Sequence, residues 1–147
     1  CGAASGKERG PSVIVADTNL VAYLLLAGEH TAAAQRVRER DAAWAAPPLW
    51  RSELRNVLIG RLRRGEIGQP EADAVMAAAV LVIGGREYFV ESGRVFALAL
   101  GSKCSAYDCE FVATAQALAV PLVTSDREIL RAFPSIAVAP ERFAPAG

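Results

Sequence analysis

Three aspartates lie next to or within apolar segments, where a carboxylate is unexpected unless it has a structural or chemical role. Asp17 directly follows the apolar run Val13–Ala16, and Asp126 comes shortly after a second apolar run, Leu122–Thr124. Asp108 falls on the apolar face of a helix when residues are spaced at 100°. A carboxylate that points toward a buried side costs free energy unless it is paired, hydrogen-bonded or bound to a cation. These three residues are therefore the first candidates for a functional site.

Helix capping is the simplest alternative role for each aspartate, because short polar side chains are preferred at helix N-termini. Ser105 and Asp108 have the S-x-x-D spacing of a capping box, which predicts a helix start there. Ser125 and Glu128 have the S-x-x-E spacing, so the next helix needs no cap from Asp126. We therefore expect Asp126 to be available at the carboxyl end of its strand, where open α/β sheets bind ligands.

A fourth carboxylate, Glu53, lies on the flank of a helix expected over Leu49–Arg64. The simpler role is a solvated first-turn carboxylate favoured by the helix dipole. Because parallel strands place their carboxyl ends along one edge, we expect the four acids to converge there. Convergent carboxylates without His or Cys partners favour a hard cation such as Mg²⁺ or Mn²⁺. Such a site supports phosphoryl chemistry.

The elements that would position these acids are short apolar strands that alternate with helices. The expected strands cover 13–16, 44–46, 122–124 and 136–138, and the expected helices cover 20–27, 30–41, 49–64, 71–83, 91–100, 106–119 and 127–132. Residues 1–11 are expected to be a disordered tail or a cloning remnant, and Pro140–Gly147 a second tail. The alternation predicts one α/β domain with a short, mostly parallel sheet flanked by helices.

Length and composition fit one globular domain. The 147 residues can bury a sizeable core, and 52% hydrophobic with 22% charged residues is ordinary. The 16 basic residues balance the 16 acidic ones, so net charge neither supports nor excludes a nucleic-acid partner. The odd number of cysteines, 3, argues against a disulfide framework and predicts reduced thiols in a cytoplasmic protein. The longest apolar run, Val75–Ile83, is too short to span a membrane.

The helix over 49–64 also carries a basic cluster. Between Arg51 and Arg64 the only acid is Glu53. The cluster is either a solvated basic face or a surface that contacts RNA phosphates or an acidic partner. Its members are Arg51, Arg55, Arg61, Arg63 and Arg64.

Three motifs in the chain resemble those of PIN-domain ribonucleases, above all the VapC-type toxins of bacterial toxin–antitoxin pairs. The motifs are V-I-V-A-D-T-N at 13–19, S-E-L at 52–54, and Y-D-C-E-F-V-A-T-A with P-L-V-T-S-D within 107–126. The resemblance covers about Ser12 to Phe143 and leaves 144–147 as a tail. Position by position, the family's four acids match Asp17, Glu53, Asp108 and Asp126, and the neighbouring polar positions match Thr18, Asn19 and Ser125.

This resemblance implies a three-layer PIN-like fold and a metal-dependent endoribonuclease that hydrolyses RNA phosphodiester bonds. The four acids would be the catalytic residues and would bind Mg²⁺ or Mn²⁺. The resemblance also implies a homodimer and a cognate antitoxin protein that neutralises the enzyme. The short apolar runs separately predict no association with a membrane.

Two other classes of function compete with this one. A PIN-like RNA-binding or regulatory module without significant nuclease activity is expected to have a broken acidic quartet, and here the quartet is intact. Among aspartyl phosphotransfer modules, two-Asp phosphatases have D-x-D after the first strand, and both they and response-regulator receivers usually have a late lysine. Here Asn19 stands at the third position, and the lysines are Lys7 and Lys103. The nuclease is therefore the function that the sequence favours.

Overall fold

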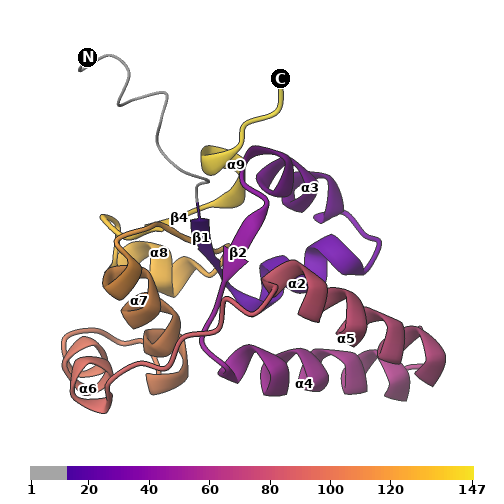
Figure 1. Cartoon of the computed structure of the whole chain (residues 1–147), viewed down its shortest axis with the longest axis horizontal. Coiled ribbons are helices and arrows are strands. Elements are labelled where there is room, and N and C mark those ends of the chain that lie inside the picture. Colours follow the sequence, from indigo (N-terminus) through magenta and orange to yellow (C-terminus); the bar gives the residue numbers. More distant parts are fainter. Residues whose placement is uncertain (1–12) are drawn as a thin grey trace.

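A four-stranded parallel sheet lies at the centre of the molecule (Figure 1). The computed structural model describes residues 13–147, so the tail predicted at 1–11 lies outside the described residues. The strands are β1 (Val13–Ala16), β2 (Ala43–Ala45), β3 (Leu122–Val123) and β4 (Ala137–Val138), in the order β2-β1-β3-β4. All three pairings are parallel. The prediction of a short parallel sheet is confirmed, and its unalternating apolar strands suit burial on both faces.

Helices cover both faces of the sheet, which gives three layers. One layer contains α2 (Thr18–Leu25), α3 (Thr31–Arg40), α4 (Leu49–Arg63) and α5 (Gln69–Ile83), which pack on one another and on β2. The other side carries α7 (Ala106–Leu118), which contacts β1 and β3, and α6 (Ser92–Leu100), which packs on α7. Next to β4 lies α8 (Arg127–Ala132).

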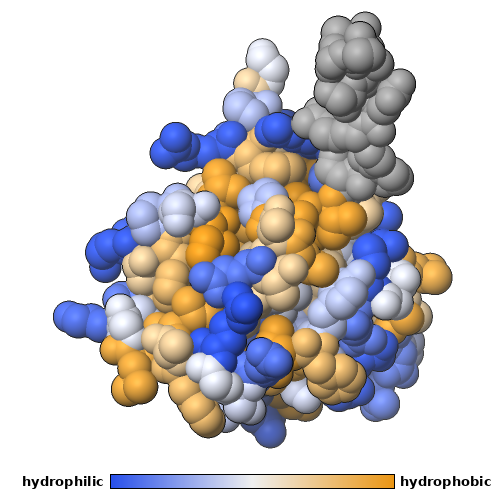
Figure 2. Space-filling model, turned by 60° about the vertical axis from the view of Figure 1, so that its left-hand side comes forward, coloured by the Kyte–Doolittle hydropathy of each residue, from blue (hydrophilic) through white to orange (hydrophobic). Residues whose placement is uncertain are grey.

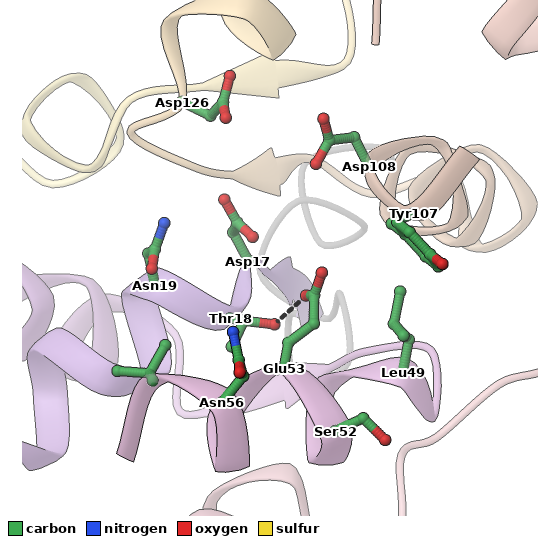
Figure 3. A pocket seen from close by; sticks show the side chains of 11 residues that line it. Asp17, Thr18, Asn19, Leu49, Ser52, Glu53, Asn56, Tyr107, Asp108 and Asp126 are labelled. Atoms are coloured by element: carbon green, nitrogen blue, oxygen red, sulfur yellow. Dashed lines mark hydrogen bonds between the residues drawn. The ribbon is translucent and has the colours of Figure 1, made fainter. Parts of the chain in front are cut away.

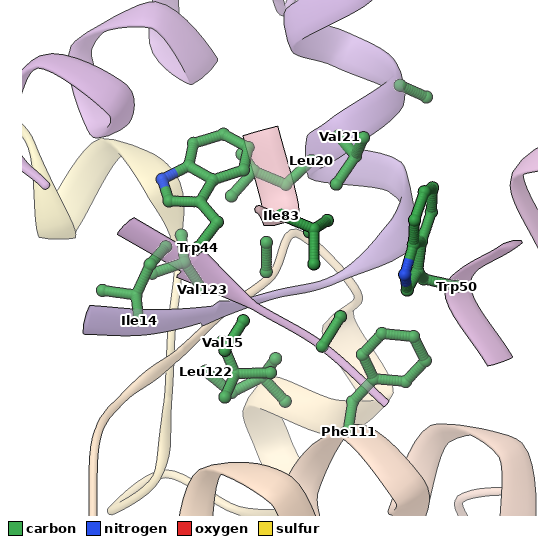
Figure 4. Close-up of a cluster of buried hydrophobic side chains, with 14 of the residues drawn as sticks. Ile14, Val15, Leu20, Val21, Trp44, Trp50, Ile83, Phe111, Leu122 and Val123 are labelled. Carbon is green, nitrogen blue, oxygen red and sulfur yellow. The ribbon is translucent and has the colours of Figure 1, made fainter. Parts of the chain in front are cut away.

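The core lies between these layers (Figure 4). Leu20, Val21 and Ile83 come from helices on one side of the sheet, and Phe111 of α7 comes from the other. Burying a side chain of this size contributes about 1.5–3 kcal/mol. Cys104 and Cys109 are free, buried thiols, as predicted. In the described part of the chain no helix is both long and apolar enough to cross a membrane.

The end of the chain differs from the sequence prediction. Residues Pro140–Phe143 form a short helix, α9, where a tail was expected. Proline fits the first turn of a helix because its missing N–H needs no partner there. The Arg40 guanidinium lies 4.4 Å from the centre of the Phe143 ring, which fastens α9 to α3. Ala144 is also buried.

Candidate active site

The parallel register of β1 and β3 places Asp17 beside Thr124. Ala16 pairs with Val123, and the Asp17 amide donates a hydrogen bond to the Val123 carbonyl at 3.2 Å. One residue further along each strand, the buried Thr124 hydroxyl donates to the Asp17 carboxylate at 2.6 Å. The strand pairing itself therefore orients the first acid.

A second hydroxyl connects Glu53 to the same strand end. Thr18 follows Asp17 at the start of α2 and is buried. Its hydroxyl donates to the Glu53 carboxylate of α4 at 2.7 Å, across 35 positions of sequence. Glu53 itself is half-buried on the helix flank, the position that the sequence predicts.

Asp126 is the N-cap of α8, contrary to the prediction that Ser125 and Glu128 cap this helix. The Asp126 carboxylate accepts a hydrogen bond from the Ile129 amide at 3.0 Å. The prediction was wrong by one residue, because α8 begins at Arg127 and the residue before it takes the cap position. One carboxylate of the quartet is thus also structural.

Asp108 lies in the first turn of α7, where the predicted capping interaction is present. The Ser105 side chain accepts a hydrogen bond from the Asp108 amide at 3.0 Å. The Asp108 side chain is partly exposed and lines a pocket on the same side as Tyr107 (Figure 3).

One pocket brings all four acids together (Figure 3). Thr18 and Asn19, predicted as secondary polar residues, also line it, whereas Ser125 does not. The remaining lining residues are Leu49, Ser52, Asn56, Val57 and Tyr107. No lysine, arginine or histidine of residues 13–147 contributes to this lining. The pocket is therefore acidic without a balancing cation of its own.

Burial and mutual repulsion raise the pKa of three of these acids. Burial raises the pKa of Asp17 to about 6, while the hydrogen bonds from Thr124 and the Thr18 backbone oppose the rise. Burial also raises the pKa of Glu53, with further contributions from Asp108 and Glu110 and with the Thr18 hydrogen bond opposing it. The pKa of Asp108 is raised by burial and then by the charge of Asp126. Negative charge in this pocket is thus costly at neutral pH.

The donor set fits a hard divalent cation in its chemistry. It offers carboxylate oxygens together with the Thr18 hydroxyl and the Asn19 side chain, and no sulfur or imidazole. Among residues 13–147, however, no three acidic, His or Cys side chains are close enough together to hold a metal ion. Thr124, Thr18 and the Ile129 amide each hold one carboxylate by a hydrogen bond in this arrangement.

The five predicted arginines are not brought into the pocket. Arg51 forms a bidentate ion pair with Glu87, at 2.8 and 2.9 Å. Arg61 and Arg64 both pair with Glu66. Within the described residues, Arg55 and Arg63 form no ion pair. The predicted cluster is therefore three neutralised arginines and two that can bind something else.

Sequence reasoning missed three residues of this site. Thr124 was assigned only to a strand, although its place at the strand end, two residues before Asp126, is the signal that could have shown its role. Asn56 lies three residues after Glu53, a spacing that puts both on one helix face. Tyr107 precedes Asp108 and is 63% exposed, which is unusual for an aromatic residue.

Comparisons with known proteins agree with this architecture. The sequence model of the family described as the PIN domain matches residues 14–134. The crystal structure of PAE2754 from Pyrobaculum aerophilum is similar, with a TM-score of 0.69 and 20% identity over 92% of this chain and 100% of that one. At this identity the likeness shows the fold alone. A search of curated proteins found no significant match.

Proposed function

The chain belongs to the PIN domain family, and from this premise we propose that it is a metal-dependent endoribonuclease. PIN domains are generally nucleases and typically bind divalent metal ions. The observation that carries the proposal is one pocket lined by Asp17, Glu53, Asp108 and Asp126, to which no basic residue of 13–147 contributes a lining side chain. Such a pocket repels an RNA phosphate unless a cation accompanies it.

The four carboxylates are the residues that would hold Mg²⁺ or Mn²⁺. A bound ion of this kind supplies positive charge for the phosphodiester and lowers the pKa of a bound water. The contribution of the protein's other groups is to position the carboxylates. Thr124 orients Asp17, Thr18 orients Glu53, and the Ile129 amide orients Asp126, each by a hydrogen bond of 3.0 Å or less. These hydrogen bonds fix three carboxylates on the wall of one pocket, and the acids must move closer together to hold one ion.

The wider assignment rests on the motifs of the sequence. We propose that the substrate is RNA, that the protein is the toxin of a VapC-type toxin–antitoxin pair, and that it acts in the cytoplasm. A homodimer and a cognate antitoxin are its proposed partners. Arg55 and Arg63, which have no carboxylate partner within residues 13–147, are the members of the basic cluster that remain for RNA or for an acidic antitoxin segment.

Mapping the ends of cleaved RNA tests this function. Total RNA is incubated with wild type in Mg²⁺, in Mn²⁺ and in excess chelator, and with Asp17→Asn in each metal. Asp73→Asn is the matched control, because Asp73 is an exposed aspartate of α5 outside the pocket. We expect new 5′-phosphate and 3′-hydroxyl ends with wild type and Asp73→Asn in metal only.

Two results would contradict the proposal. Undiminished cleavage in chelator would show that the reaction does not depend on a metal ion. Undiminished cleavage by Asp17→Asn would show that the acidic pocket is not the active site. RNA that binds but stays intact would favour the alternative function, an RNA-binding or regulatory module.

A further inference from the structure

The acidic pocket has two chemically different ends (Figure 3). Asn19 and Asn56 present amide side chains at one end, and Tyr107 and Leu49 lie together at the other. The carboxylates lie between these ends. A substrate that crosses the pocket therefore meets polar groups on one side and an aromatic ring on the other.

No side chain that lines this pocket supplies positive charge to hold RNA. Its ionisable lining residues are the four carboxylates and Tyr107. Single-stranded nucleic acid is bound in two main ways, by basic groups along the backbone and by stacking of bases on aromatic rings. Where basic groups are missing from the lining, stacking is the contribution that remains.

Tyr107 has the exposure and the position for such stacking. It is 63% exposed in the first turn of α7, immediately before Asp108, so its ring is not part of the core. A second hollow contains the residues next in sequence to two pocket residues, Pro48 before Leu49 and Ala106 before Tyr107, and its lining also includes Phe89, Phe96 and Glu110. Phe89 and Phe96 are 90% and 61% exposed. On the side that carries α6 and α7, apolar side chains reach the surface between hydrophilic ones (Figure 2).

We propose that Tyr107 is a substrate-binding residue that stacks on an RNA base next to the scissile phosphate. The proposal rests on the nuclease function and names how its substrate is held. The substrate must then be single-stranded at this point, because a base inside a duplex has no free face.

Binding of two ligands of equal charge tests the stacking. One is a short single-stranded oligoadenylate with a 2-aminopurine in place of one adenine, and the other is an abasic ribose-phosphate chain of equal length. All proteins carry Asp17→Asn, so that the RNA stays intact. Tyr107→Ala removes the ring, Tyr107→Phe keeps it, and Tyr88→Ala removes a tyrosine that is 40% exposed but lies outside the pocket.

We expect Tyr107→Ala to weaken oligoadenylate binding about 5- to 100-fold, while Tyr107→Phe and Tyr88→Ala keep the parental affinity. The abasic chain should bind equally to the parent and to Tyr107→Ala. The fluorescence of 2-aminopurine should be quenched by the parent and by Tyr107→Phe only. Melting temperatures should not change, since the ring is exposed.

Three results would overturn the inference: equal oligoadenylate affinity in the parent and Tyr107→Ala, an equal loss for the abasic chain, or no measurable binding of oligoadenylate by the parent. Failure of the proposed nuclease function can be distinguished from failure of the stacking proposal. Wild type would then leave RNA uncut in Mg²⁺ and Mn²⁺, while the binding results would still decide the role of Tyr107.

Discussion

Two threonine hydroxyls, those of Thr124 and Thr18, orient two of the four acids by hydrogen bonds. Thr124 is fully buried, and its hydroxyl donates to Asp17 while accepting from the Asp126 amide at 3.0 Å. Thr18, next to Asp17, donates its hydroxyl hydrogen bond to Glu53. A hydroxyl can do both because it is a donor and an acceptor at once. The acids are thus held by neutral groups, which leave their negative charge uncompensated.

Replacing Asp17 by Asn should stabilise the protein in the absence of metal. The folded-state pKa of about 6 lies above the ordinary value of 3.8, so the unfolded chain releases this proton first as pH rises. The folded state therefore loses stability between these two pH values and carries the full penalty above pH 6. The difference corresponds to about 2–3 kcal/mol. Urea unfolding of wild type and Asp17→Asn in chelator at pH 8 measures it, and about half of the difference should remain at pH 5, which lies between the two pKa values.

The same variant should respond less to metal. Added Mn²⁺ should raise the melting temperature of wild type at pH 8 clearly more than that of Asp17→Asn, because binding to the folded state stabilises it. If Asp17→Asn is less stable than wild type at pH 8, Asp17 is an ordinary structural carboxylate and the penalty does not exist.

Replacing Thr124 by Val should destabilise the protein by about 1–3 kcal/mol, because it leaves the Asp17 carboxylate and the Asp126 amide without their partner. The loss should be larger at pH 8 than at pH 5, since the Thr124 hydrogen bond lowers the pKa of Asp17. Urea unfolding at both pH values measures it.

Thr114→Val is the matched control. Thr114 is equally buried, but its hydroxyl donates only to the Glu110 carbonyl of its own helix, at 2.8 Å. Its loss should be small and independent of pH. Equal behaviour of the two valine variants would show that Thr124 does not act through Asp17.

The candidate acids could be predicted from sequence, but their hydrogen-bond partners could not. A carboxylate that follows an apolar run can be recognised in the amino-acid sequence, and so can the S-x-x-D motif at the start of α7. The Asp17–Thr124 contact needs the register of β1 against β3, which joins positions more than a hundred residues apart. The sequence prediction assigned the N-cap of α8 to the wrong residue. Ser125 and Asp126 are both favoured N-cap residues, and only the backbone conformation decides between them.

At the scale of elements, the first turn of α4 is fixed by Glu87. The Trp50 indole N–H donates to this carboxylate at 2.7 Å, and Arg51 adds two hydrogen bonds. Glu87 is itself held at the edge of the sheet by a bridge with Ala46. Arg51 and Trp50 lower the pKa of Glu87. Because Glu53 follows two residues after Arg51, this contact also positions Glu53 over the pocket.

Glu87→Ala should destabilise the protein by about 1–3 kcal/mol, since the buried Trp50 N–H loses its acceptor. It should also lower the cleavage rate several-fold through Glu53. The stability difference should shrink at low pH, because a lowered carboxyl pKa contributes stability that is lost on protonation. Chemical denaturation and cleavage kinetics measure both effects.

Glu66→Ala is the control at the other end of α4. Glu66 pairs with Arg61 and Arg64 on the surface, where ion pairs contribute little. We expect it to change neither stability nor rate measurably. An unchanged rate in Glu87→Ala would mean that Glu53 keeps its place without this contact.

The elements themselves followed the sequence well where apolar periodicity or caps were clear. The helices α4 and α7 and the strand β1 lie within one residue of their predicted bounds. The helix α9 was missed because its four residues contain too few positions to show a helical period. It forms by packing of Phe143 on Arg40 of α3, a tertiary contact that local sequence does not reveal.

At the scale of the molecule, acidic charge is concentrated in the pocket although acidic and basic residues balance over the whole sequence. The pocket collects four acids, while α4 carries arginines beyond it. At 100° per residue, Arg63 lies two turns, about 10 Å, beyond Asn56 on the pocket face of α4. Arg55 instead lines a hollow between α4 and α5 with Gln69 and Asp73. Of the five arginines in the cluster on α4, Arg63 is the one that combines the pocket face with a guanidinium that forms no ion pair within residues 13–147.

Arg63→Gln should therefore weaken RNA binding, whereas Arg55→Gln should not. Each lost phosphate contact reduces the slope of log affinity against log salt by about 0.7 for a single strand. Titrations of a single-stranded oligoribonucleotide at several salt concentrations, with Asp17→Asn in every protein, give this slope. Arg55→Gln removes the same charge from the same helix, so it corrects for any effect of net charge. Equal slopes in the two glutamine variants would show that Arg63 is a solvated surface residue, and that RNA approaches the pocket from another direction.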